Sequence, residues 1–203
     1  MDYPKFFDEI PKVIVYDHLA AFLGSTSDGV LEYGYLDAVK LAGHSCPTVA
    51  ASYWMTRLAL NALYGEEMAS RGGIRVEFSA QRDAGVTGVM ATVVQLLTGA
   101  AGDEGFKGLS GIFFRRNLMT FGIDGTHQIR FTNRDNRRSI DVSVDLSRIP
   151  MTRELSQLLQ RCLHGECSTQ ECRQFGEMWQ ERVRKLIFEH GADSEVFKLV
   201  QGR

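Results

Sequence analysis

The chain has 203 residues, of which 44% are hydrophobic and 24% are charged, and its formal net charge at pH 7 is -2. These values are ordinary for a folded globular protein, and they exclude a disordered chain, a collagen-like chain and a coiled-coil rod. Because a near-neutral chain has no global positive field, we expect neither a nucleic-acid partner nor a membrane partner.

The compartment is predicted from the N-terminal segment and from the cysteines. Acidic residues and two prolines, Pro4 and Pro11, stand where a secretory signal would need a basic start and a continuous apolar run. No apolar stretch reaches the roughly 18 residues that a membrane-spanning helix needs. One cysteine lies in the first half and three lie close together near the end, a distribution that does not suggest a disulfide framework. We therefore expect a cytoplasmic protein whose cysteines are free thiols or metal ligands.

The first two thirds of the chain predict alternating helices and strands. Short helical patterns over residues 1–41 predict a helical lead-in. The clearest helix is predicted over 47–64, because Pro47 suits the first helical position, Gly65 can end the helix, and its residues are apolar on nearly every face. Alternating apolar and polar residues over 74–81 predict a half-buried strand, and the apolar run 89–99 predicts a second buried helix.

Three strand-like runs follow a glycine-rich stretch, at 117–123, 127–133 and 139–145. The order of helix, strand, helix and three strands predicts an α+β fold, in which a mixed sheet packs on buried helices.

Beyond Pro150 the pattern becomes wholly helical, with Gly165 separating two apolar-faced helices. We therefore predict an α+β domain over 1–149 and a C-terminal helical extension, a hairpin, over 150–203. Two such helices are not stable alone, so we expect the hairpin to pack on the domain or to form a homodimer contact.

The segment Gly43-His44-Ser45-Cys46-Pro47 places an imidazole and a thiol two residues apart, just before the predicted buried helix. Residues at this spacing can face the same side, and a thiolate at a helix N-terminus is stabilised by the unpaired amides and the helix dipole. His44 and Cys46 could therefore bind a thiophilic metal such as zinc, or Cys46 could be a nucleophile with His44 as its base. A packed cysteine beside a capping histidine is the third interpretation.

The same residues carry a resemblance to a family. The segment LAGHSCPTVAASYWMTRLAL resembles the His-x-Cys-Pro segment and following helix of the FmdE family, which is named after a component of formylmethanofuran dehydrogenase. The later segment VVQLLTGA, with Gln95, Thr98 and Gly99, resembles that family's Gln and Thr-Gly segment. The resemblance covers roughly residues 15–149, and it implies an α+β protein that binds a metal, with zinc expected and with His44 and Cys46 as ligands.

The chain also departs from that family. Val89 and Ala100 stand where typical members carry cysteines, and the zinc finger that some members append is not recognisable. The remaining ligands would then be water, substrate or other side chains, so we expect an open coordination site for a small-molecule ligand. Asp37 is the further candidate ligand that we retain. His18, Glu77 and Asp83 are weaker candidates, because a lone polar side chain more often caps a helix or faces solvent.

Two other features have competing interpretations. Cys162, Cys167 and Cys172 are spaced C-x4-C-x4-C, and in a continuous helix five residues turn by about 140°, so only a turn at Gly165 could bring some of these thiols together. We interpret them as ordinary thiols, with a metal or redox role as the alternative.

The segment from Lys107 to Arg138 contains seven basic residues but only two acidic ones. We favour a solvated strand face over an anion site for this excess.

The sequence thus predicts a zinc-binding protein of the FmdE type. One alternative is a metal- or thiol-dependent hydrolase or transferase that acts on a small carbonyl compound. The other is an accessory subunit that docks on a partner through its C-terminal helices.

Overall fold

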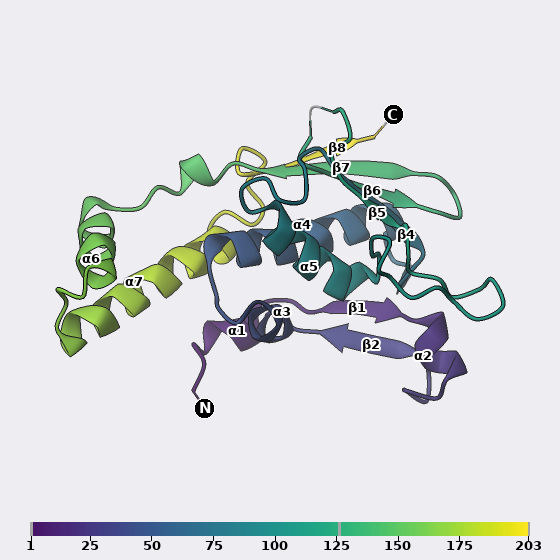
Figure 1. Ribbon diagram of the computed structural model, residues 1–203, viewed down its shortest axis with the longest axis horizontal. Coiled ribbons are helices and arrows are strands. Elements are labelled where there is room, and N and C mark those ends of the chain that lie inside the picture. Colours follow the sequence, from purple (N-terminus) through teal and green to yellow (C-terminus); the bar gives the residue numbers. More distant parts are fainter. Residues whose placement is uncertain (1, 126, 203) are drawn as a thin grey trace.

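The computed structural model of the protein describes residues 2–125 and 127–202. The predicted α+β class is confirmed. Helices and strands are interspersed along the chain, and the strands form two separate sheets. The helices α4 (Pro47–Tyr64) and α5 (Thr87–Thr98) pack against each other and lie between the two sheets (Figure 1).

The smaller sheet takes two of its three strands from residues 1–41, which were predicted to be helical. Its strands, in the order β2-β1-β3, are β2 (Val30–Tyr33), β1 (Val13–Tyr16) and β3 (Ala69–Ser70). The helices around them are α1 (Phe6–Glu9), α2 (His18–Phe22) and α3 (Tyr35–Ala42). The predicted helical lead-in is therefore confirmed at α1, α2 and α3 and wrong at β1 and β2. The run VIVY has β-branched residues that suit a strand, and its antiparallel partner lies beyond α2.

The predicted central helix is confirmed as α4, with the predicted bounds. Cys46 caps its N-terminus, Pro47 occupies the first helical position, and Gly65 follows its last residue. Side chains on most of its faces are buried, because α5, α7 (Thr169–Phe188) and the larger sheet all contact it. The second predicted helix is α5, and Gly99 ends it in the left-handed conformation at φ +72°.

The larger sheet contains the four predicted strands, each shorter than expected, and one strand that was not predicted. In order across the sheet they are β5 (Met119–Thr120), β4 (Ile74–Phe78), β6 (Ile129–Asn133), β7 (Ser139–Val144) and β8 (Phe197–Gln201). The pairs β4–β6, β6–β7 and β7–β8 are antiparallel, whereas β4–β5 is parallel. On β4 the alternate residues Ile74, Val76 and Phe78 are buried, as the period-two pattern predicts.

The C-terminal segment contains the predicted hairpin and one strand that was not predicted. After a short 3-10 helix (Leu146–Arg148), α6 (Arg153–Leu163) and the first half of α7 project beyond the sheets, and the second half of α7 packs on α4 (Figure 1). The chain then returns as β8 beside β7. The prediction of a wholly helical extension was therefore wrong at 197–201. None of the helices in the described ranges is long and apolar enough to cross a bilayer.

Candidate metal centre

Three cysteines of the α6–α7 hairpin lie together where the two helices join. Cys162 belongs to the last turn of α6, Cys167 to the connection and Cys172 to the first turn of α7. Their Sγ atoms lie within 4.8 Å of one another. The Sγ of Cys162 lies 2.8 Å from that of Cys167 and 4.0 Å from that of Cys172. The cluster could therefore hold a metal ion.

Local structure brings these thiols together. Gly165 takes a left-handed conformation at φ +71°, which reverses the chain directly after α6. Ser168 and Glu171 form a reciprocal capping box that begins α7. An ion pair of 2.6 Å between Arg161 Nη1 and Glu171 Oε1 ties the last turn of α6 to the first turn of α7. Cys167 lies in neither helix, so the rotation of a continuous helix does not separate the three thiols.

The distances are compatible with a tetrahedral thiolate site. Zinc–sulfur bonds of about 2.3 Å place neighbouring sulfur atoms about 3.8 Å apart. The Cys162–Cys172 distance of 4.0 Å is already close to this value, and the Cys162–Cys167 distance of 2.8 Å must increase by about 1 Å. Because all three side chains are half-buried or exposed, small rotations can supply this change.

Protonation of the thiols competes with metal binding in this cluster. The hydrogen bond from the Cys162 thiol to Cys167, together with burial, raises the pKa of Cys162 to about 12. Without a cation, a thiolate here would face two neighbouring sulfur atoms at close range. A divalent metal would stabilise the thiolates because it binds them directly, so metal binding should release protons.

The fourth position of the site is open. Over residues 2–125 and 127–202, no further His, Cys, Asp or Glu side chain joins the group of three. His164 is exposed and lies two residues after Cys162, but its ring is outside the group. Water or an external ligand can therefore complete a tetrahedral site.

The predicted ligands His44 and Cys46 lie in the connection between α3 and α4. Gly43 ends α3 at φ +75°, and the Sγ of Cys46 accepts a hydrogen bond from the Val49 N–H (3.5 Å), which caps α4. The Nδ1 of His44 lies 2.9 Å from the Ala42 carbonyl oxygen. Since a carbonyl only accepts, Nδ1 carries a proton, and in the neutral ring Nε2 is the atom with the free lone pair.

Helix α7 anchors this same connection. The Ser45 carbonyl accepts hydrogen bonds from Trp179 Nε1 (3.1 Å) and Gln180 Nε2 (3.2 Å). The Ser45 hydroxyl lies 2.8 Å from the hydroxyl of Tyr35, whose pKa is raised by burial. The helix that carries Cys172 at one end therefore fixes the backbone between His44 and Cys46 near its middle.

The other predicted ligands do not gather around His44 and Cys46. One carboxylate oxygen of Asp37 accepts the Gly34 N–H (2.8 Å) at the start of α3, whereas His44 follows the opposite end of that helix. The weaker candidates lie on α2, on β4 and in the exposed connection after β4; they are His18, Glu77 and Asp83. No group of three possible ligand atoms in the described residues includes any of these side chains. Metal binding by His44 and Cys46 stays a prediction.

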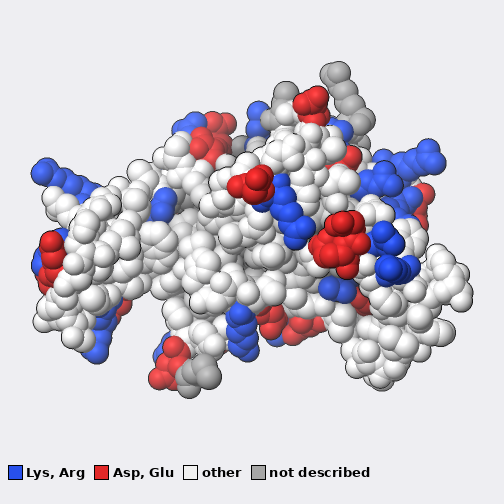
Figure 2. All heavy atoms as spheres, viewed as in Figure 1, with Lys and Arg blue, Asp and Glu red and all other residues white. Residues whose placement is uncertain are grey.

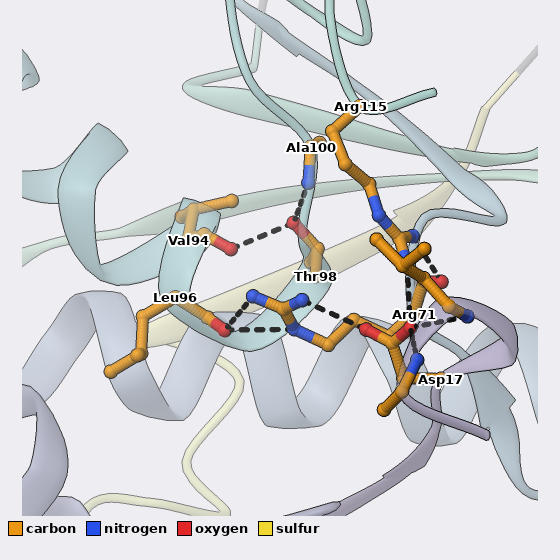
Figure 3. A network of polar contacts seen from close by, with 9 residues as sticks. Asp17, Arg71, Val94, Leu96, Thr98, Ala100 and Arg115 are labelled. Atoms are coloured by element: carbon orange, nitrogen blue, oxygen red, sulfur yellow. Dashed lines mark hydrogen bonds and ion pairs between the residues drawn. The ribbon is translucent and has the colours of Figure 1, made fainter. Parts of the chain in front are cut away.

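A buried ion-pair network that was not predicted from the sequence joins the start of α2, α5, the turn after β3 and the connection before β5 (Figure 3). The Oδ1 of Asp17 accepts the Leu19 and Ala20 N–H groups, which caps α2. The same carboxylate pairs with Arg71 Nη1 (2.9 Å) and Arg115 Nη2 (2.7 Å). Burial alone would raise the pKa of Asp17, but the Ala20 N–H and the two guanidinium groups together hold it below its ordinary value.

The arginines of this network have further backbone acceptors. Arg71 Nε and Nη2 both donate to the Leu96 carbonyl (3.2 and 3.0 Å), and Arg115 Nη1 donates to the Arg71 carbonyl. Arg115 was expected on a solvated strand face; this was wrong, because its side chain is only 10% exposed. It follows three apolar residues, Ile112–Phe114, and precedes Arg116 and Asn117, so the sequence there shows no alternation that would indicate burial.

Comparison with known proteins does not extend the assignment. No protein-family model matches the chain, and no curated protein is significantly similar to it.

Proposed function

We propose that this protein binds zinc through Cys162, Cys167 and Cys172. The observation that supports the proposal is the approach of three Sγ atoms to within 4.8 Å of one another, from three different local elements. Thiolates are soft ligands that select zinc, copper(I) or iron–sulfur clusters. Zinc fits best here because it accepts three protein ligands and leaves a fourth position for water or another donor.

The metal would stabilise the projecting hairpin. Few α6 side chains are buried, and within the helix these are Leu155 and Leu158. An ion bound to Cys162 and Cys172 would cross-link the end of α6 to the start of α7, next to the Arg161–Glu171 ion pair. Because an unfolded hairpin has no preformed site, the free energy of metal binding would add to the stability of the hairpin.

A second candidate is the open metal site at His44 and Cys46 that the FmdE resemblance implies. It is supported by the His44 tautomer, because histidine ligands of metals commonly donate their second ring N–H to a carbonyl group. It is also supported by the place of Cys46 at the N-terminus of an 18-residue helix, where a thiolate is stabilised. A metal held there by two side chains would keep positions for a small-molecule ligand.

Elemental analysis of tag-free protein would distinguish these sites. We would compare the wild type with Cys167→Ser and with the double variant His44→Ala/Cys46→Ser, after reconstitution with zinc and removal of excess metal. If the hairpin site alone binds, the wild type retains about one zinc per chain, Cys167→Ser loses it, and the double variant keeps it. Loss in the double variant alone would refute the hairpin site and favour the FmdE-type site.

Cobalt substitution would test the donor set directly. Three thiolate ligands should give intense sulfur-to-cobalt charge-transfer absorption that weakens in Cys167→Ser. Circular dichroism would check that each variant keeps its helices. Iron in place of zinc, or a wild type that stays metal-free after reconstitution, would refute the zinc proposal.

A further inference from the structure

A cavity of about 290 Å³ lies beside the Asp17 network, far along the chain from the cysteines of the hairpin. It is bounded by the turn between β3 and β4, by loop 111–114, by the β6–β7 turn and by the start of α2. Its volume is at the lower end of the range for small-molecule sites, about 300–1,000 Å³. No cysteine lines it, so its role is independent of metal binding at the cysteine sites.

Three arginines line this cavity. Arg115 is buried, Arg71 lies beside it, and Arg134 extends from the β6–β7 turn. Asp17 is the carboxylate that both Arg71 and Arg115 contact, so this buried group carries two positive charges and one negative charge. Asp135 also lines the cavity, but it is exposed to solvent. Burial lowers the pKa of Arg115, because a charge in this position is poorly solvated.

These arginines retain donors for a ligand. A guanidinium group has five N–H bonds. Within the described residues, Arg115 donates to the Arg71 carbonyl and to Asp17. Arg134 donates from Nη1 to the Gly72 carbonyl (2.8 Å), and its guanidinium carbon lies 4.5 Å from the centre of the Phe114 ring. The remaining donors match the oxygens of a phosphate or carboxylate group.

The backbone around the arginines leaves little freedom to rearrange. Gly72 has φ +83°, and a Cβ atom there would lie 1.2 Å from Arg115 Nη1, so the guanidinium occupies space that only glycine leaves. The turn 109–112, which leads into loop 111–114, is closed by mutual hydrogen bonds between Leu109 and Ile112, each 2.9 Å. Phe113 has φ +61°, an uncommon conformation for a bulky residue that is often found where a loop is held for binding.

The rim of the cavity is apolar. Ile112 is 56% exposed, and the ring of Phe113 packs against Phe22, which is 64% exposed. In Figure 2 the lobe at lower right, formed by α2 and the turn that follows it, shows no Lys, Arg, Asp or Glu side chains on this face. The cavity thus combines a cationic interior with an apolar edge.

We propose that this cavity binds a small organic anion. Its phosphate or carboxylate group pairs with Arg115 and Arg134, and its apolar body lies against Ile112 and Phe113. Paired arginine donors favour anions with two or more oxygens, and the apolar rim favours an aryl or alkyl substituent over a bare inorganic ion.

Phenyl phosphate, benzoate and inorganic phosphate serve as probes in calorimetric titrations of the full-length chain. We expect phenyl phosphate to bind at least about tenfold more tightly than inorganic phosphate, because burial of a ring contributes more than 1.4 kcal/mol. Ile112→Ser should reduce this preference and leave the affinity for inorganic phosphate nearly unchanged.

Arg134→Gln is the decisive variant, because this side chain is exposed and its loss should not unfold the chain. It should weaken phenyl phosphate binding by about tenfold or more, as expected for a lost charged hydrogen bond. Arg137→Gln is the matched control, since Arg137 lies in the same turn but does not line the cavity. Its affinity should stay within about twofold of the wild type.

Three results would overturn the proposal. The first is no saturable binding of phenyl phosphate or benzoate. The second is equal affinity in the two arginine variants, which would indicate general charge attraction or another site. The third is binding to phosphatidylserine vesicles that requires Arg134 but no binding of the small probes, which would assign the surface to a membrane.

Discussion

Asp17 pairs with two arginine side chains in the interior, so the substitution Asp17→Asn tests the buried network with little change in shape. Asparagine is as good an N-cap as aspartate, so the cap of α2 should survive. The substitution removes one negative charge from between Arg71 and Arg115, whose side chains are 20% and 10% exposed. Two guanidinium groups would then remain close together without a carboxylate.

The expected loss of stability follows from the contacts that remain. Removing one partner from a buried ion pair costs about 3–5 kcal/mol. Arg71 is partly solvated and keeps its two hydrogen bonds to Leu96, and Arg115 keeps its bond to the Arg71 carbonyl, so we reduce the figure to about 2–4 kcal/mol. For a chain of this size each kcal/mol lowers Tm by about 2–4 °C, which predicts a decrease of about 4–16 °C.

Urea and thermal unfolding, followed by circular dichroism, would measure this loss. Asp145→Asn is the control, because Asp145 caps the short 3-10 helix from an exposed position and should change stability much less. The pKa of Asp17 is lower in the folded than in the unfolded state, so its contribution is present above the unfolded value of 3.8 and disappears as the pH falls through the lower folded value. The stabilities of the wild type and Asp17→Asn should therefore begin to converge below about pH 4 and become equal only below the folded pKa of Asp17. A loss below about 1 kcal/mol at neutral pH would contradict the reasoning.

Three further predictions concern the buried Asp17 network and the α6–α7 hairpin. Gly72→Ala should destabilise the chain strongly, because the added Cβ would overlap Arg115 Nη1. Gly111→Ala is the control in the same unfolding assay: Gly111 has a similar φ but open space around it, so this variant measures the backbone strain alone. Removal of zinc by a chelator should speed hydrogen exchange in α6 and at the start of α7 and leave α4 unchanged; uniform exchange would argue against a metal in the hairpin. Hydrogen bonds from Ser168, with the Arg161 ion pair, lower the pKa of Glu171 to about 2. In the metal-free chain the stabilisation of the hairpin by Glu171 should thus be complete above about pH 4.5 and disappear toward pH 2, which the helicity of the chain would report. Glu171→Gln should abolish this pH dependence.

The long elements could be predicted because their periodicity or capping is local. The bounds of α4 follow from Pro47, from Gly65 and from an apolar pattern of 18 residues. The strands β1 and β8 could not be predicted this way. Both have exposed apolar residues, Ile14 on β1 and Leu199 and Val200 on β8, so neither shows a clear alternation, and each is stabilised by pairing with a strand elsewhere in the chain, β2 and β7 respectively. The homodimer contact expected at the hairpin stays a prediction, and light scattering would test it.

The same distinction between local sequence and long-range packing applies to the candidate sites. The sequence by itself determined the α+β class, the buried central helix and the approach of His44 and Cys46 to the N-terminus of that helix, since each depends on neighbouring residues. Only the tertiary structure decided that Cys162, Cys167 and Cys172 meet, because the chain reversal at Gly165 and the Arg161–Glu171 ion pair fold two helices onto each other. It also decided that Asp17 pairs with Arg115 across 98 positions, because desolvated charges must find opposite charges wherever packing places them.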